Sequence, residues 1–80
     1  MNALKLTREE LVGEPEERKL ATGKSILSFN VKISDKIAAL NTGNRFDYRN
    51  ELYEIMNKEP VNSPVSYIKF NCIQKTGVNA

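Results

Sequence analysis

The stretch Tyr67–Lys75 carries the side chains with the clearest capacity for chemistry. If it is a strand, its alternation places Tyr67, Lys69, Asn71 and Ile73 on one face. A tyrosine ring beside a lysine can stack on a nucleobase while the ammonium group attracts a neighbouring phosphate. The residues alone leave a second interpretation open, in which Tyr67 packs at the rim of the fold beneath a neighbouring strand.

Further basic side chains accompany a second alternating stretch nearer the N-terminus. Lys32 is expected on the polar face of that stretch, with Arg18 and Lys24 near the turn that leads into it. Phe46 either begins a helix or projects from a loop, where its ring would be a second stacking candidate. These residues would supply phosphate contacts if the two stretches lie side by side.

The residue types that most often catalyse reactions or bind metals are scarce. The chain has no histidine, and its one cysteine, Cys72, is expected on the apolar face of its strand. Glu14, Glu16 and Glu17 lie in a highly charged turn, where hydration keeps them from acting as a catalytic pair. No glycine-rich phosphate loop is present. We therefore expect no enzymatic activity, no cofactor and no metal site.

Length and composition set the broad class of the protein. The 80 residues are enough for one domain, 1–80, with a thin core. A content of 40% hydrophobic and 28% charged residues is typical of a globular chain rather than a disordered one. No apolar run approaches the roughly 20 residues of a membrane helix, and no signal peptide is recognisable. With a single cysteine, this composition predicts a cytoplasmic protein without membrane attachment.

Charge is distributed unevenly along the chain. Residues 9–17 contain five glutamates and no basic residue, whereas residues 18–50 contain seven basic and two acidic residues. This asymmetry is expected if one surface meets a polyanion. The alternative interpretation is a solvated surface with scattered lysines.

The residue pattern predicts one clear strand followed by a short helix. Leu27–Ile33 alternates with the period of two of a half-buried strand. Ser34 is suited to cap the N-terminus of the helix, and Gly43 to follow its C-terminus. Residues 4–12 begin like a strand, although a helix starting at Thr7 is equally compatible with the glutamates that follow.

A second helix is predicted over Phe46–Lys58. Tyr48, Leu52, Ile55 and Met56 recur at the spacing that places them on one helical face. The expected order of elements is therefore strand, strand, two-helix excursion, strand.

Two parts of the chain resemble the bacterial and phage single-stranded DNA-binding protein family. Glu14–Arg18 is similar to that family's acidic-Pro-Glu-x-Arg element, and Leu27–Val31 resembles its second strand. Tyr67–Lys75 resembles the next strand of its sheet. The resemblance spans about residues 4–34 and 65–80.

This resemblance implies a fold and a site. The fold would be mainly β, an OB-fold-like incomplete barrel of about three strands, with a helical insertion at about 35–59. Tyr67 matches a position of a base-stacking aromatic residue, Lys69 a basic position beside it, and Ile73 a position where a second aromatic residue is frequent. The candidate nucleic-acid-binding residues are Arg18, Lys24, Lys32, Phe46, Tyr67, Lys69, Ile73 and Lys75.

The expected function is binding of single-stranded DNA with little sequence specificity, by stacking and phosphate neutralisation. The family's last strands would follow Ala80, so we expect an open sheet edge and a homo-oligomer. Replication or recombination proteins are the other partners that the resemblance implies, and the sequence does not separate DNA from RNA. The alternative is a small protein-interaction module, an inhibitor or adaptor, whose helical insertion presents Leu52, Ile55 and Met56.

Overall fold

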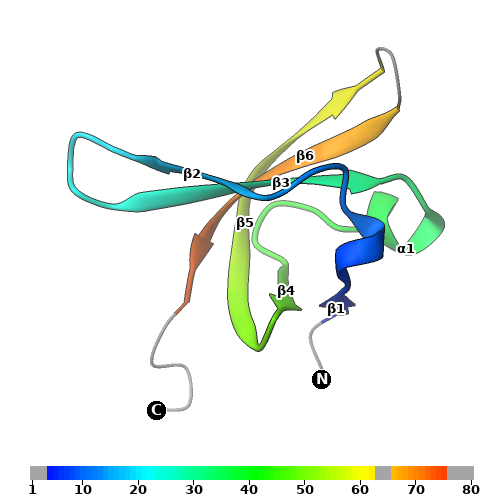
Figure 1. The fold of residues 1–80 in the computed structure, drawn as a ribbon, viewed down its shortest axis with the longest axis horizontal. Coiled ribbons are helices and arrows are strands. Elements are labelled where there is room, and N and C mark those ends of the chain that lie inside the picture. The colour runs from blue at the N-terminus through cyan, green and yellow to red at the C-terminus, as the bar shows by residue number, and fades with distance from the viewer. Residues whose placement is uncertain (1–3, 63–65, 76–80) are drawn as a thin grey trace.

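One curled six-stranded sheet forms almost the whole described protein (Figure 1). The computed structural model describes residues 4–62 and 66–75. The strands are β1 (Leu4–Leu6), β2 (Glu16–Lys19), β3 (Ser25–Lys32), β4 (Arg45–Tyr48), β5 (Glu51–Val61) and β6 (Tyr67–Gln74). Their order across the sheet is β1-β4-β5-β6-β3-β2. The helical elements are the short α1 (Asp35–Ala38) and the 3-10 turn η1 (Arg8–Glu10).

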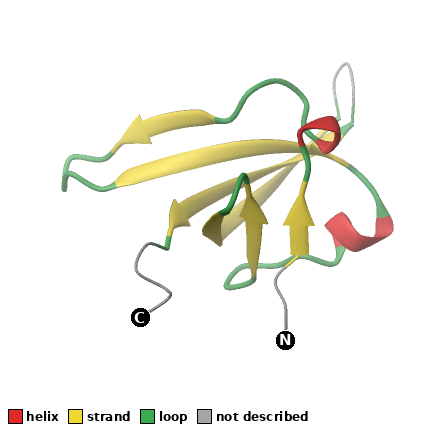
Figure 2. Cartoon of the chain, turned by 60° about the horizontal axis from the view of Figure 1, so that its bottom comes forward, coloured by secondary structure: helices red, strands yellow, loops and turns green. Residues whose placement is uncertain are grey.

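The two edge strands of the sheet, β1 and β2, follow each other directly in the sequence. β1 pairs in parallel with β4 at one edge, and β2 pairs antiparallel with β3 at the other. Between them, η1 turns the chain, and Leu11 then pairs with Val31 of β3. The N-terminal segment thereby curls the sheet around its apolar face, as the side view shows (Figure 2).

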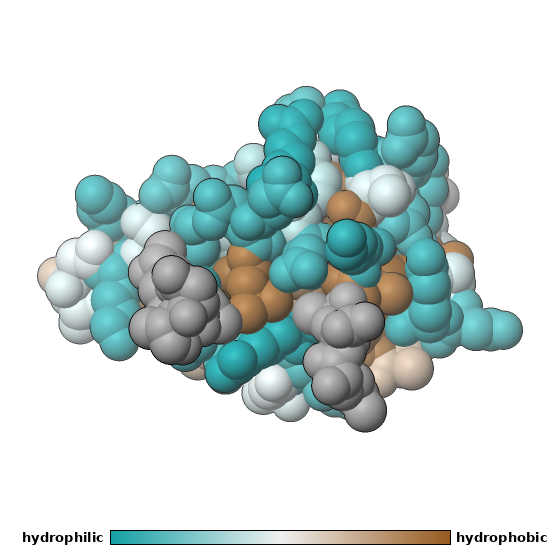
Figure 3. Space-filling model, turned by 90° about the horizontal axis from the view of Figure 1, so that it is seen from below, coloured by the Kyte–Doolittle hydropathy of each residue, from teal (hydrophilic) through white to brown (hydrophobic). Residues whose placement is uncertain are grey.

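The core is aromatic and lies on the inner face of the curled sheet. Phe29 is its centre, with ring centroids 4.9 Å from Tyr53, 5.1 Å from Phe46 and 5.5 Å from Tyr48 in edge-to-face geometry. From below, apolar residues show between polar ones (Figure 3). The buried apolar residues are Leu6, Leu11, Phe29, Val31, Ile37, Phe46, Tyr48, Tyr53, Ile55, Ile68, Phe70 and Cys72.

The helix predicted over 46–58 is wrong, because this segment is the β4–β5 hairpin. Phe46 and Tyr48 point into the core from β4, and Tyr53 and Ile55 do so from β5. The hairpin is closed by Arg49 and Asn50, which have φ values of 52° and 67°. Two consecutive positive φ values are typical of the tight turns that match the twist of a hairpin.

A bulge in β5 explains why its alternation is hard to see in the sequence. The register with β6 shifts between Ile55 and Asn57, and Met56 at the bulge is exposed. Beyond the bulge the even-numbered residues face inward, so Lys58 lies opposite Phe70. Its Nζ donates to the carbonyl oxygens of Ala38 (3.3 Å) and Leu40 (2.9 Å), at the C-terminal end of α1.

The remaining elements agree with the sequence pattern in type. The two alternating stretches are β3 and β6, and Ser34 caps α1 by accepting from the Ile37 amide. Gly43 has a φ of 92°, the left-handed conformation expected of it. Residues 4–12 combine both alternatives, a short strand and a 3-10 turn. The fold is thus mainly β as expected, but it is not an OB-fold with a helical insertion at 35–59, since only Asp35–Ala38 is α-helical there.

Candidate nucleic-acid interface

Strand β6 separates the candidate binding residues from the core. Phe70 and Cys72 are fully buried, and Ile68 is 7% exposed, all on the inner face. Tyr67 and Lys69 alternate with them and therefore lie on the outer face, where both are partly exposed. The alternation predicted for this stretch is confirmed.

Tyr67 lies near the β5–β6 connection, between two partners of different character. In register, Lys32 of β3 is on one side and Val61 of β5 is on the other. Cross-strand neighbours on one face are about 5 Å apart, so the Lys32 side chain starts close to the tyrosine ring. The ring therefore has an apolar neighbour and a cationic neighbour.

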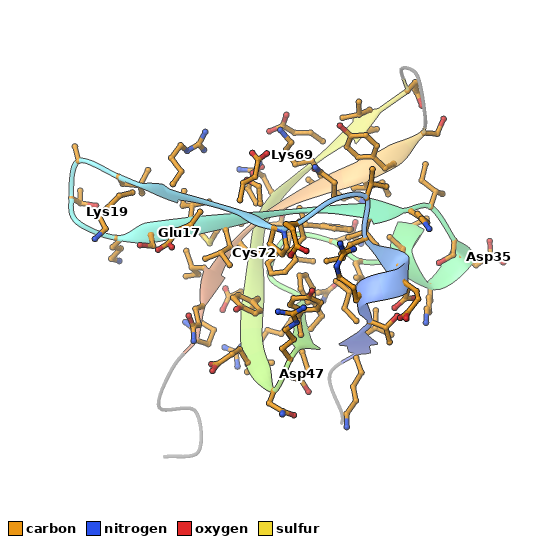
Figure 4. All side chains as sticks on the ribbon, in the orientation of Figure 1. Glu17, Lys19, Asp35, Asp47, Lys69 and Cys72 are labelled. Carbon is orange, nitrogen blue, oxygen red and sulfur yellow. The ribbon has the colours of Figure 1, made fainter. Side chains whose placement is uncertain are left out.

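Lys69 is the second cation on this face, and Figure 4 shows it on the outer side of the sheet. Its register neighbours are Asn30 of β3 and Glu59 of β5. Within the described ranges, no carboxylate lies within salt-bridge distance of its ammonium group. Asn30 Oδ1 is buried and has no hydrogen-bond partner there either. A cation and an amide thus lie side by side, next to Tyr67.

Asn71 organises the middle of the outer face. It is 6% exposed, and its Oδ1 accepts from Ser28 Oγ at 2.6 Å. Its Nδ2 donates to Asn57 Oδ1 at 2.7 Å and to Glu59 Oε2 at 2.9 Å. This network ties β3, β5 and β6 together. It also engages the Glu59 carboxylate, which would otherwise be free to pair with Lys69.

A second group of candidate residues meets where β3 and β6 separate. The β3–β6 ladder ends at Leu27 and Cys72. Beyond this point β3 remains paired with β2, and β6 remains paired with β5. The open pocket between them, about 440 Å³, is lined by Lys24, Ser25, Ile73, Gln74 and Lys75. The fold therefore brings together three of the predicted binding residues here, at the opposite end of β6 from Tyr67.

Lys75 is not a free cation. Its Nζ is 3.5 Å from Glu54 Oε1, which also lies 3.4 Å from Arg45 Nη2. The shared carboxylate partly neutralises both cations. Lys24 has no carboxylate partner among the described residues, so it is the stronger anion-attracting group of the pocket.

Two predicted site residues belong to neither group. Phe46 is on β4 and fully buried in the aromatic core, so it neither begins a helix nor projects from a loop, and its ring is not available for stacking. Arg18 lies on β2, in the hairpin that β2 and β3 form beyond the body of the sheet (Figure 1). We call this hairpin, residues 16–28, the β2–β3 arm.

The one cysteine of the chain, Cys72, lies in the core and not on this surface. Burial raises the pKa of the Cys72 thiol to about 12, so little thiolate forms near neutral pH. No group of three or more Cys, Asp or Glu side chains among residues 4–62 and 66–75 could hold a metal ion. In the same part of the chain, no helix is long and apolar enough to cross a membrane.

The sequence pattern missed the residues that flank Tyr67 and Lys69 on the β5 side. Asn57, Glu59 and Val61 come next to β6 only because their segment is a strand. The local signal is the polar pair Arg49-Asn50 between two short aromatic alternations, and it is weak because Arg-Asn lacks the glycine that typically marks a two-residue hairpin turn.

Comparison of the chain with protein-family models, with curated proteins and with solved structures finds no match.

Proposed function

We propose that the protein binds single-stranded DNA with little sequence preference through the outer face of β6. The observation that carries this proposal is the outward position of Tyr67, Lys69 and Lys32 on adjacent strands whose other face is fixed in the core. An aromatic ring with one cation on the neighbouring strand and another two residues along its own strand supplies the stacking and phosphate contacts that single strands need.

The geometry supports an extended binding path along β6. Tyr67 and Lys75 are eight residues apart, which corresponds to about 26 Å along a strand. One base would stack on Tyr67, with Lys32 and Lys69 contacting phosphates beside it. The Lys24–Lys75 pocket would receive a further phosphate at the other end, with Ile73 as an apolar contact.

The polar network between the two ends favours weak sequence preference. The Oδ1 of Asn71 already accepts a hydrogen bond, and its Nδ2 already donates two. These groups are therefore not free to distinguish base edges. Stacking on a tyrosine tolerates every base, because each base has a π face.

A titration of fluorescent oligo-dT at several salt concentrations tests the proposal. Neutralising about three phosphates predicts a slope of log affinity against log salt near −2. Tyr67→Ala should lose about 1–3 kcal/mol of binding free energy, while Tyr67→Phe keeps the ring and most of the affinity. Lys69→Ala should make the slope shallower by about 0.7, whereas Lys5→Ala, which removes an exposed lysine of the edge strand β1, should not.

Two outcomes of this titration would contradict DNA binding through Tyr67. Absence of binding at low salt contradicts the proposal, as does binding that Tyr67→Ala leaves unchanged. A parallel titration with oligo-rU shows whether the surface prefers DNA over RNA.

The alternative of a protein-interaction module loses the surface on which it was based. Ile55 is fully buried and Met56 lies in the β5 bulge, so these two residues and Leu52 do not form one exposed helical face. We therefore do not develop it as a second function.

A further inference from the structure

The β2–β3 arm has an edge that no described strand pairs with, and the negative and positive charges of β2 lie at opposite ends of that strand. All four residues of β2 are exposed, and among the strands of residues 4–62 and 66–75 only β3 pairs with β2. Glu16 and Glu17 lie toward the body of the protein, while Arg18 and Lys19 lie toward the tip (Figures 1 and 4). Two such arms in antiparallel orientation would place the positively charged tip of each arm beside the two glutamates of the other arm.

The backbone of β2 determines which of its residues can pair outward. The Leu20 amide donates to the Lys24 carbonyl within the arm, and backbone groups alternate between the two edges of a strand. The amides and carbonyls of Glu16 and Arg18 therefore face β3. Those of Glu17 and Lys19 face away, so these two residues are the ones that a further strand could pair with.

We propose that two copies of the chain associate through antiparallel pairing of their β2 edges, with a two-fold axis between the two Arg18 residues. In this register Glu17 of each copy lies opposite Lys19 of the other and exchanges two backbone hydrogen bonds with it. On the other face of the new ladder the two Arg18 residues lie opposite each other, and each has the second copy's Glu16 as its diagonal neighbour.

Neighbouring symmetric registers are less favourable. A two-fold axis at Glu17 would face two glutamates and would need an amide hydrogen from Pro15, which proline lacks. An axis at Lys19 would face two lysines and would place Glu17 opposite Ala21, so no glutamate would face a basic residue directly. Parallel pairing in register would also set like charges against each other, so the E-E-R-K sequence selects the antiparallel dimer. Because pairing uses the free edge of both arms, the dimer is closed and does not extend into a fibre.

Sedimentation equilibrium without nucleic acid tests this pairing, so the result is independent of the proposed DNA binding. The series should run to roughly 1 mM chain, because interfaces this small associate weakly. Glu17→Lys should weaken dimerisation about tenfold at low salt, since both Glu17–Lys19 pairs become repulsive. Glu9→Lys, the same charge change on exposed η1, should leave it unchanged.

Charge reversal of the whole strand provides the rescue. The variant with Glu16→Lys, Glu17→Lys, Arg18→Glu and Lys19→Glu restores antiparallel complementarity and should dimerise about as well as the natural chain. A chain that remains monomeric throughout the series overturns the proposal. So does a dimer that Glu17→Lys leaves intact, or a reversed strand that fails to restore association while its circular dichroism spectrum shows a folded sheet.

Disulfide formation tests the register. Residues at position 18 would form a non-hydrogen-bonded pair with Cα atoms about 4.5 Å apart, within the range that a disulfide spans. Mild oxidation of Arg18→Cys should therefore give covalent dimers, at least about tenfold more than Lys19→Cys, whose partner position is 17. Buried Cys72 stays out of this reaction. Equal cross-linking at both positions, or none at Arg18→Cys, overturns the register.

Discussion

Replacing Asn71 by aspartate should show how much the hydrogen bonds of Asn71 contribute to the stability of the protein. The change is nearly isosteric and keeps the oxygen that accepts from Ser28. It replaces the Nδ2 donor by a second oxygen, which then faces Asn57 Oδ1 and Glu59 Oε2 at the positions now 2.7 and 2.9 Å away. Two hydrogen bonds become oxygen–oxygen repulsions, one of them between two carboxylates.

The size of the effect follows from these contacts. Each lost hydrogen bond is worth about 1 kcal/mol. Repulsion between unit charges at ~3 Å is at most about 5 kcal/mol at an effective dielectric constant near 20, and exposure of the Glu59 side chain reduces it strongly. We expect Asn71→Asp to lower the free energy of unfolding by about 2–4 kcal/mol at pH 7. This is a large share of the roughly 4–12 kcal/mol typical of a domain this size.

The loss should also depend on pH with a definite sign. Burial and the neighbouring carboxylate raise the pKa of the introduced carboxyl in the folded state above its unfolded value of about 3.9. The folded variant therefore binds a proton more tightly than the unfolded one. The penalty is small below about pH 4 and grows as the pH rises through the raised folded value.

Urea unfolding at pH 4 and pH 7 measures both quantities. Asn57→Asp is the matched control, because it adds the same charge to the network but keeps an oxygen that accepts from Asn71 at an exposed position. Its cost should stay below about 1 kcal/mol. If Asn71→Asp destabilises the protein no more than Asn57→Asp at pH 7, the reasoning about this network is refuted.

Three further predictions concern the core and the N-terminal turn. Phe29→Ala should cost about 3–5 kcal/mol in thermal or urea unfolding, since it empties the centre of the aromatic cluster; a loss below about 1 kcal/mol would show that the cluster is not the core. With its pKa raised to about 12, Cys72 should resist alkylation by iodoacetamide at pH 8 until the protein is unfolded in urea, and rapid labelling of the folded chain would contradict its burial. Burial opposes ionisation of Glu10, but hydrogen bonds from Thr7 and Lys36 outweigh it and lower its pKa below the usual 4.5, so its contribution to stability is lost as the pH falls through that lowered value. Glu10→Gln should abolish this small acid-dependent loss, and an unchanged pH profile in urea unfolding would argue against it.

The sequence pattern predicted β3 and β6 because both lie within the sheet with one face on the core. Phe29 and Val31 on β3, and Phe70 and Cys72 on β6, alternate with polar residues without interruption. Such a pattern depends only on local spacing and on which side of the strand is buried. The outward placement of Tyr67, on which the candidate site depends, followed from the same spacing.

The β4–β5 hairpin was mistaken for a helix because two periodicities overlap in it. Tyr48, Leu52, Ile55 and Met56 fit a helical face, and the β-bulge at Met56 interrupts the alternation that would have revealed a strand. The choice between the two was made by tertiary pairing with β6, which no local pattern contains. For the same reason Phe46 was expected either to begin a helix or to project from a loop, although pairing of β4 places it in the core.

Positions in the candidate site that depend on strand neighbours were equally inaccessible from the sequence. The closeness of Lys32 to Tyr67 and of Lys24 to Ile73 results from the β3–β6 ladder and the point where it ends. Glu54 and Glu59, which moderate the positive charge of this face, come from β5. Lys75, one of the predicted phosphate contacts, is therefore paired with a carboxylate that the sequence pattern did not place beside it.

The central claim is that the outer face of β6 receives a single-stranded nucleic acid. Nitrogen-15 amide spectra recorded during titration with unlabelled oligo-dT test it most directly. The largest shifts are expected at Tyr67, Lys69 and Lys32, with smaller shifts around Lys24 and Ile73. Shifts confined to the β2–β3 arm, or spectra that the oligonucleotide leaves unchanged at low salt, would contradict it.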